Sequence, residues 1–206
     1  MKKPEKFWNR IANNFDKLES KDKPTYMNII NKTRNYLKVS DIVLDFGCGT
    51  GLISLEIAGS VKMVHGVDIS SKMIEVSNRK AVERKIHNVE NVCSTIFDER
   101  YKSGSFDVIL AFYILHLLEE PQKVLQRIYE LLKPDGFFIS ALPCLKEKPI
   151  FYNMLSFGGK IGIIPKIISF GISELESTFI KENFKIIEKE CLNQNLKQYF
   201  IAAKKV

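Results

Sequence analysis

The sequence has few of the residues that build metal clusters or disulfide frameworks. Its 206 residues include four cysteines, and no two of them form a C-x-x-C pair. Histidine is scarce as well, with three in the whole chain. We therefore predict neither a metal site nor a disulfide scaffold, and we expect the cysteines to be reduced core residues.

A long uninterrupted apolar run is also missing. The richest stretch, residues 149–172, is broken by glycines, a proline and lysines, so no membrane-spanning segment is expected. The N-terminus lacks the apolar centre of a secretion signal, which favours a cytoplasmic protein. Since 45% of the residues are apolar, the length predicts a single domain, 1–206, with one sizeable core.

The net charge of +7 is spread along the chain. The 31 basic and 24 acidic residues are interleaved and form no basic block. This pattern favours a solvated basic surface and predicts no nucleic-acid partner. An anionic macromolecule or a membrane surface is the alternative source of such a charge.

Strand and helix patterns alternate through the middle of the chain. Two amphipathic helical patterns precede residue 38. Apolar runs predict strands at 41–46, 62–68, 88–94, 106–112 and 136–142. Helical patterns fall between them at 52–58, 71–84 and 121–132. This order predicts an α/β, doubly wound, mostly parallel sheet, and a helix from Ser173 with strands at 184–191 and 197–204 adds an antiparallel pair at its edge.

Glycines occupy every second position after the first strand. The segment Asp45-Phe46-Gly47-Cys48-Gly49-Thr50-Gly51 leads into a helix. Positions without side chains let a ligand approach the backbone, and the helix N-terminus favours a partly anionic group. A dinucleotide fingerprint would need its third glycine at position 52, which is Leu52, so a nicotinamide cofactor fits less well.

The second strand ends in a carboxylate, Asp68. The parallel sheet places this strand end beside the glycine loop, where a carboxylate can accept hydrogen bonds from both hydroxyls of a ribose. The alternative is an N-cap for the helix that begins at Ser71. A third pattern comprises the strand segment 104–118 and the turn 131–136 before the fifth strand.

These three patterns, in order over residues 40–142, resemble class I S-adenosylmethionine-dependent methyltransferases of the small-molecule, methyltransferase type 11-like group. The resemblance implies a Rossmann-like doubly wound sheet of seven strands, mostly parallel with an antiparallel C-terminal edge strand. It implies S-adenosylmethionine as the cofactor, with its amino-acid end on the glycine loop. The implied cofactor contacts are Asp45, Gly47, Cys48, Gly49, Gly51, Asp68, Ile69, Met73, Thr95, Ile96 and Ala111.

Two positions depart from the pattern of this group. Many relatives carry an acidic residue after the third strand, where this chain has Ser94 and Thr95. The turn before the fifth strand has Asp135 where glycine is usual, and aspartate adopts positive φ better than most residues.

Methyl transfer from a sulfonium needs no dedicated nucleophile. In-line displacement is accelerated mainly by aligning acceptor, methyl and sulfur. A general base helps when the acceptor must lose a proton, and His116 is the best candidate, with Tyr113 as a second. The alternative for His116 is a packed structural role. Nothing basic is paired with Cys48 in the sequence, so we interpret it as a small space-filling residue.

The resemblance divides the single domain into four parts. They are an N-terminal helical lid (1–38), a cofactor-binding core (39–142), a substrate-capping insertion (143–172) and a C-terminal helix and strand pair (173–206). Trp8 and Phe15 belong to the lid or, equally, pack a helix on the sheet. The apolar segment 149–172 covers a pocket for an apolar or amphipathic small molecule, or instead pairs with a second copy in a homodimer or touches a membrane surface.

We therefore predict methyl transfer to a small acceptor molecule. Methylation of RNA or protein is the second enzymatic alternative, although no RNA-binding module and no Asn-Pro-Pro-Tyr-like tetrapeptide accompanies the fourth strand. A non-catalytic S-adenosylmethionine-binding partner subunit is the third alternative. Such a subunit is expected to have a degraded glycine loop or to lack the acidic residue, and both are intact in this sequence.

Overall fold

A seven-stranded sheet runs through the middle of the computed structural model, which describes residues 3–206 without the side chains of Lys3 and Lys21. The strands are β1 (Ile42–Phe46), β2 (Met63–Asp68), β3 (Val89–Cys93), β4 (Phe106–Phe112), β5 (Leu132–Pro143), β6 (Phe184–Asn193) and β7 (Gln198–Lys205). Their order in the sheet is β3-β2-β1-β4-β5-β7-β6. The strands β1 to β5 pair in parallel, whereas β7 runs antiparallel to both β5 and β6. The predicted fold class is confirmed, with β6 at the edge and β7 between it and β5.

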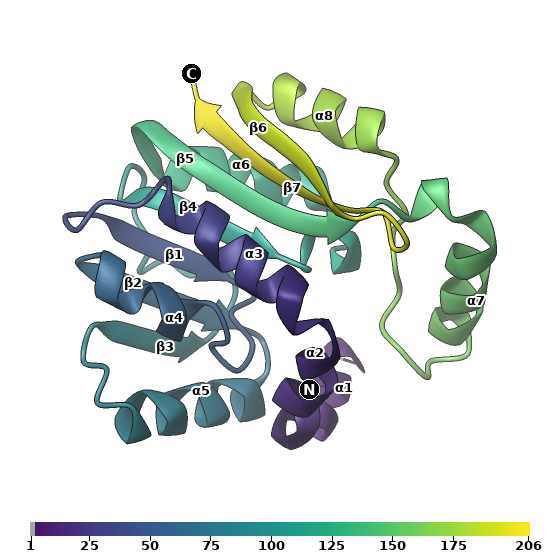
Figure 1. The fold of residues 1–206 in the computed structure, drawn as a ribbon, viewed down its shortest axis with the longest axis horizontal. Helices are drawn as coiled ribbons and strands as arrows, with labels where there is room; N and C mark the ends of the chain where they lie inside the picture. The colour runs from purple at the N-terminus through teal and green to yellow at the C-terminus, as the bar shows by residue number, and fades with distance from the viewer. Residues whose placement is uncertain (1–2) are drawn as a thin grey trace.

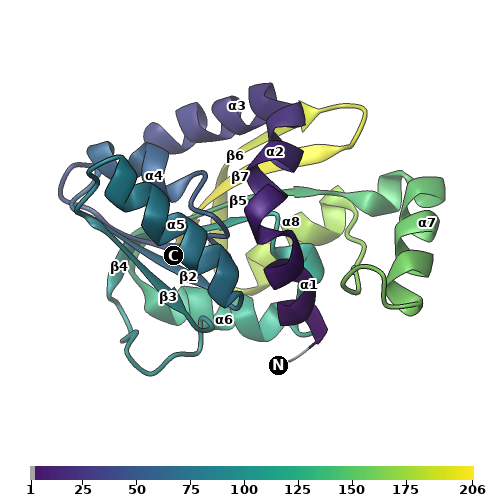
Figure 2. The ribbon, with the colours of Figure 1, turned by 90° about the horizontal axis from the view of Figure 1, so that it is seen from below.

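Helices cover both faces of this sheet. They are α1 (Lys3–Ile11), α2 (Phe15–Glu19), α3 (Lys23–Arg34), α4 (Ser54–Ile57), α5 (Ser71–Glu83), α6 (Pro121–Leu131), α7 (Pro149–Lys160) and α8 (Ile172–Lys181). Figures 1 and 2 show α3, α4 and α5 on one face and α6 and α8 on the other. This is the three-layer arrangement that right-handed crossovers between parallel strands produce.

The central strand β4 shows why the sheet is enclosed. Val108, Leu110 and Phe112 pack in the cluster that includes the buried isoleucines of α3 and α4. The alternate residues Ile109 and Ala111 pack with α6 and α8. A strand that is apolar on both faces can be buried only between two helical layers.

Helix boundaries differ slightly from the sequence prediction. The helix predicted at 52–58 is α4, which is limited to Ser54–Ile57 because the chain continues as a 3₁₀ turn over Ala58–Ser60. The helix predicted from Ser173 begins one residue earlier, at Ile172, after Gly171. Asp135 has a φ of 63°, as predicted for its turn, and its carboxylate pairs with Lys204 at 2.8 Å.

Two peripheral segments flank the carboxyl ends of the parallel strands. α1 packs against α5, and residues 1–2 of the predicted lid lie outside the described residues. α7 stands away from the sheet on the right of Figure 1, and none of its residues is buried. Among residues 3–206, no helix is both long enough and apolar enough to span a membrane.

Candidate active site

The loop after β1 is held against the end of β2. The parallel register pairs Asp45 with Gly66 and Phe46 with Val67. The N–H groups of Gly47 and Cys48 both donate to the carbonyl of Val67, at 2.8 and 3.2 Å. The glycine loop therefore lies where β2 delivers its last residue, Asp68.

The three glycines of the loop all have left-handed backbone conformations. Their φ angles are 76° at Gly47, 54° at Gly49 and 76° at Gly51. A Cβ atom on Gly51 would lie 2.3 Å from the hydroxyl oxygen of Ser77, and one on Gly47 would lie 3.1 Å from Cβ of Ile114. Backbone strain disfavours side chains at all three positions, and lack of space disfavours them further at Gly47 and Gly51.

The open side of the glycine loop faces two apolar side chains. Ile114 lies against Gly47, and the ring of Phe15 lies near Gly49, 3.8 Å from the place of a Cβ atom. A ligand that binds against these glycines therefore contacts or displaces both side chains. The cradle fits a narrow, partly anionic group that can use backbone N–H donors.

Asp68 links the two strand ends. Its carboxylate accepts hydrogen bonds from the N–H of Gly49 at 3.1 Å and the N–H of Ser70 at 2.8 Å. Burial raises the pKa of this carboxyl. The N-cap of α5 is Ser70, whose hydroxyl accepts from the N–H of Met73 at 3.1 Å. The N-cap role that was the alternative for Asp68 therefore belongs to Ser70.

Asp45 is fully enclosed beneath the loop. The hydroxyl of Ser54, in the first turn of α4, donates to its carboxylate. Burial raises the pKa of Asp45 to about 6. This carboxyl joins β1 to α4, and its contact with the cofactor stays a prediction. The burial of Cys48 beside it raises the pKa of that thiol well above its usual value, in keeping with a space-filling role.

The N-terminal segment is tied to both halves of the site. Asn9 accepts hydrogen bonds from the hydroxyl of Ser70 at 2.7 Å and the N–H of Lys72 at 3.1 Å. Asp16 accepts from the hydroxyl of Thr50 and from the ammonium of Lys80, the latter at 2.6 Å. Sequence reasoning missed these contacts because they join residues far apart in the chain.

Apolar packing reinforces these polar contacts. Trp8, Ala12 and Phe15 pack with Met73 and Val76 of α5. Met73 is consequently covered by the N-terminal segment and packs that segment against α5, and its contact with the cofactor stays a prediction. Trp8 and Phe15 therefore pack the N-terminal segment on α5, Phe15 also lies near Gly49, and the lid role stays a prediction.

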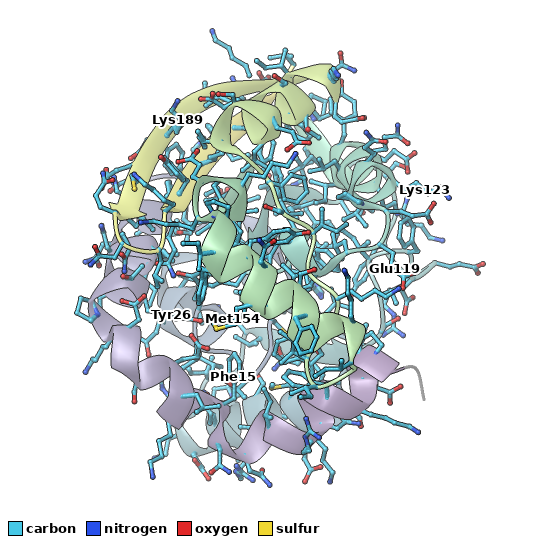
Figure 3. All side chains as sticks on the ribbon, turned by 90° about the vertical axis from the view of Figure 1, so that its right-hand side faces the viewer. Phe15, Tyr26, Glu119, Lys123, Met154 and Lys189 are labelled. Atoms are coloured by element: carbon cyan, nitrogen blue, oxygen red, sulfur yellow. The ribbon has the colours of Figure 1, made fainter. Side chains whose placement is uncertain are left out.

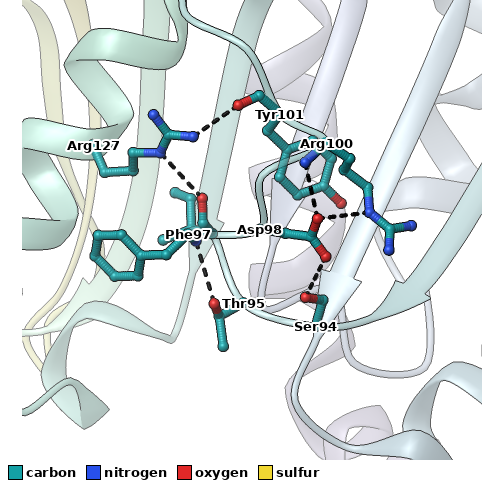
Figure 4. A network of polar contacts seen from close by, with 8 residues as sticks. Ser94, Thr95, Phe97, Asp98, Arg100, Tyr101 and Arg127 are labelled. Atoms are coloured by element: carbon teal, nitrogen blue, oxygen red, sulfur yellow. Dashed lines mark hydrogen bonds and ion pairs between the residues drawn. The ribbon is translucent and has the colours of Figure 1, made fainter.

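In the loop after β3, polar side chains form hydrogen bonds with other residues of the same loop (Figure 4). Asp98 accepts from the hydroxyl of Ser94 at 2.6 Å and from Nε of Arg100 at 2.9 Å. Its interaction with Arg100 lowers the pKa of Asp98 to about 2. The exposed Thr95 accepts from the N–H of Phe97 at 3.3 Å. An acidic residue is present in this loop after all, four positions beyond Ser94, and it stabilises the loop.

Two predicted cofactor contacts, Ile96 and Ala111, have buried side chains, and their contact with the cofactor stays a prediction. Ile96 and Ala111 are 1% and 0% exposed and pack in the core between the sheet and α6. Their side chains have no surface for a ligand, and only their backbones can contribute. Ile69, in contrast, is exposed at the end of β2, where an adenine ring can lie against it.

His116 lies in a short 3₁₀ turn, Leu115–Leu117, after β4. Its carbonyl accepts from the N–H of Ile168 at 2.7 Å, which joins this turn to the segment before α8. Within the described residues, its buried Nδ1 has no hydrogen-bond partner. Burial lowers the pKa of the imidazole to about 4, so His116 is neutral at pH 7.

Tyr113 has a φ of 54°, which turns the chain out of β4. Its ring packs against Tyr26 of α3, with centroids 5.6 Å apart. Burial raises its pKa, so the phenol is a neutral hydrogen-bond donor. Its buried hydroxyl has no partner among residues 3–206. Left-handed conformations of bulky residues often mark functional sites.

Gln198 is a residue that the sequence patterns did not reveal. It begins β7 and is 8% exposed, and its side-chain oxygen has no partner in the described chain. Alternation along β7 places it on the same face as Phe200, which packs in the cluster that Tyr113 contacts. A buried amide oxygen without a partner is a place for an incoming donor.

Comparison with known sequences identifies this arrangement. The profile of a family described as "Methyltransferase domain" matches residues 37–202, which contain the glycine loop, Asp68, β6 and the first part of β7. The chain belongs to this methyltransferase family. The predicted recognition is thereby confirmed, and S-adenosylmethionine is the cofactor of the enzyme.

Individual relatives agree with the family. The methyltransferase is 28% identical over 124 residues to the ubiquinone biosynthesis O-methyltransferase of Coxiella burnetii, covering 60% of this chain and 53% of that one. It is 26% identical over 137 residues to the uncharacterized methyltransferase YcgJ of Bacillus subtilis, covering 66% of this chain and 54% of that one. The chain thus spans about half the length of these curated relatives.

Solved structures share the fold. The crystal structure of YcgJ superimposes with a TM-score of 0.73 at 18% identity, covering 87% of this chain and 98% of that one. The geranyl diphosphate C-methyltransferase of Streptomyces coelicolor, solved with S-adenosyl-L-homocysteine, superimposes with a TM-score of 0.72 at 15% identity, covering 93% of this chain and 80% of that one.

We predict that Asp68→Ala weakens S-adenosylmethionine binding at least tenfold. The substitution removes the carboxylate that is predicted to accept the ribose hydroxyls, and a hydrogen bond to a charged group is worth about 1.5–3 kcal/mol. Titration calorimetry measures the dissociation constant, and Asp135→Ala, which removes an exposed carboxylate, is the matched control. An unchanged constant in a folded Asp68→Ala protein would place the ribose elsewhere.

We also predict a pH effect that belongs to His116. Its folded-state pKa of about 4 is lower than the usual 6.5, so the unfolded chain takes up a proton first as the pH falls. The contribution of His116 to the free energy of unfolding is therefore complete above pH 6.5 and is lost between pH 6.5 and 4, by about 3 kcal/mol in total. Urea unfolding at several pH values should show a steeper loss for the wild type than for His116→Leu. Parallel curves would contradict the buried, neutral imidazole.

Proposed function

We propose that this methyltransferase transfers the methyl group of S-adenosylmethionine to a small apolar or amphipathic acceptor. The observation that carries the proposal is the surroundings of Tyr113. A buried aromatic pair and polar atoms without partners lie directly beside the turn that contacts Gly47. Small-molecule sites typically combine such apolar walls with a few buried polar groups.

The cofactor would be held by the two strand ends. The backbone of residues 47–51 would receive the amino-acid tail, and Asp68 would accept the ribose hydroxyls. When bound, the sulfonium supplies an already activated methyl group. Asn9 and Asp16 would keep the N-terminal segment over this site through their bonds to Ser70 and Lys80, which excludes water.

The acceptor would be oriented by neutral hydrogen-bonding groups. Tyr113 can donate from its phenol, and the side-chain oxygen of Gln198 can accept. Both groups are buried, so a polar atom of the acceptor that reaches them satisfies two otherwise unpaired atoms. Orientation of this kind is the main contribution that such an enzyme makes to transfer.

His116 would take up the proton when the acceptor must lose one. Its imidazole is neutral at physiological pH and its Nδ1 has no partner in the described structure. Its low pKa makes it a weak base in this environment. An acceptor hydroxyl becomes strongly acidic only as its oxygen bonds to the methyl group, so His116 would accept the proton from that oxygen as the methyl is transferred.

The relatives support the same class of acceptor. The Coxiella burnetii relative is named as a ubiquinone biosynthesis O-methyltransferase, and an enzyme of that name acts on small molecules. A similar acceptor for this chain would be apolar with one or more ionisable hydroxyls. That is the chemistry that Tyr26, Tyr113 and Gln198 can accommodate.

The proposal is tested by methyl transfer to an acceptor panel. Radiolabelled S-adenosylmethionine is incubated with the enzyme and with lipophilic phenols, lipophilic amines, total tRNA or a protein extract. We expect label in the phenol fraction above the level of an Asp68→Ala control. Label in tRNA or protein with none in the small molecules would overturn the proposal.

We predict that Tyr113→Phe raises the KM for the best small acceptor about two- to tenfold, because one hydrogen bond of about 0.5–1.5 kcal/mol is lost. The ring that packs on Tyr26 is kept, so the dissociation constant of S-adenosylmethionine should not change. Steady-state kinetics and calorimetry measure the two quantities. Tyr36→Phe, on the same face of the sheet, is the control. A wild-type KM would remove Tyr113 from the acceptor site.

A further inference from the structure

Helix α7 carries an exposed apolar stripe. Ile150, Met154, Phe157 and Ile161 are 87%, 62%, 64% and 54% exposed. Their spacings of four, three and four residues place them on one face of the helix. We call these four residues the α7 stripe. Large apolar side chains gathered in this way indicate a surface that is covered in use.

The charged residues within the segment that carries this stripe have one sign. Residues 148–173 contain Lys148, Lys160 and Lys166 and no aspartate or glutamate. Lys160 and Lys166 are exposed, and Lys148 is partly buried. An apolar helix face flanked by lysines is typical of a helix that lies on an anionic membrane surface.

The position of α7 leaves the stripe accessible. The helix stands away from the sheet in Figure 1. In Figure 3, which views the molecule from this end, α7 crosses the front of the molecule and Met154 lies at its edge, on the side of Tyr26 and Phe15.

We propose that the α7 stripe docks on an anionic phospholipid bilayer, with the helix lying in the plane of the interface. At 12 residues, α7 is too short to cross the bilayer, which takes about 20. Its apolar side chains enter the acyl boundary while the lysines contact lipid phosphates. This goes beyond the proposed function and does not depend on it, although a lipid-soluble acceptor would be delivered at the same surface.

The charge pattern favours lipid over a second copy of the chain. A two-fold dimer through the same stripe would bring the lysines of one copy toward those of the other, with no acidic residue in the segment to pair with them. Like charges brought together in this way disfavour association. The predicted homodimer through residues 149–172 is therefore the competing outcome of the test.

The test is flotation of the full chain with lipid vesicles. Vesicles of phosphatidylcholine with 30% phosphatidylglycerol, chosen as roughly the anionic fraction that gives a strong surface potential, are compared with vesicles of phosphatidylcholine alone. We expect binding to the anionic vesicles that weakens as salt rises. Binding is measured without acceptor or turnover, and Asp68→Ala should bind equally, so this result is independent of the proposed function.

Variants separate the stripe from general charge. Met154→Glu with Phe157→Glu should weaken vesicle binding at least tenfold. The matched control is Ile180→Glu with Ile187→Glu, which makes the same charge change at residues 63% and 47% exposed outside the stripe and should bind more tightly than the stripe variant. Replacing Lys160 and Lys166 by glutamine should weaken the affinity for anionic vesicles about fivefold for each lysine.

Insertion has a separate readout. Phe157→Trp should be quenched by brominated lipid acyl chains in anionic vesicles, and Ile180→Trp should not. Equal binding of the stripe variant and the control, or absence of quenching at position 157, would overturn the proposal. The competing outcome is a protein that does not bind vesicles and forms a dimer that the stripe variant abolishes. That result would overturn membrane docking in favour of self-association.

Discussion

The parallel pairing of β1 with β2 is the constraint on which the site depends. It places the N–H of Gly47 on the carbonyl of Val67, and it brings the carboxylate of Asp68 to the N–H of Gly49. A glycine loop and an acid that are 17 residues apart or more in the chain thereby become one surface. Every proposed role, from cofactor grip to acceptor position, follows from that alignment.

Features that reside in short stretches of sequence could be predicted. The alternating glycines require left-handed backbone, and all three have it. The same reasoning predicted a positive φ at Asp135. Strand positions were predictable because a parallel strand buried on both faces is apolar throughout, as β4 is. These signals need no knowledge of distant residues.

Features that depend on distant contacts could not be predicted. The bonds from Asn9 to Ser70 and from Asp16 to Lys80 join residues more than 60 positions apart. Gln198 is buried because β7 inserts beside β5, which no local pattern specifies. The burial of Ile96 depends on how α6 closes over the loop after β3. In each case the partner surface, not the residue type, decides the role.

The central claim is that residues 47–51 and Asp68 together hold S-adenosylmethionine. A crystal structure with S-adenosyl-L-homocysteine tests it most directly. The account predicts both ribose hydroxyls on the carboxylate of Asp68, the amino-acid tail on the glycine loop, and movement of Ile114 or Phe15 to admit it. A nucleotide bound elsewhere, with both side chains still seated on Gly47 and Gly49, would contradict it.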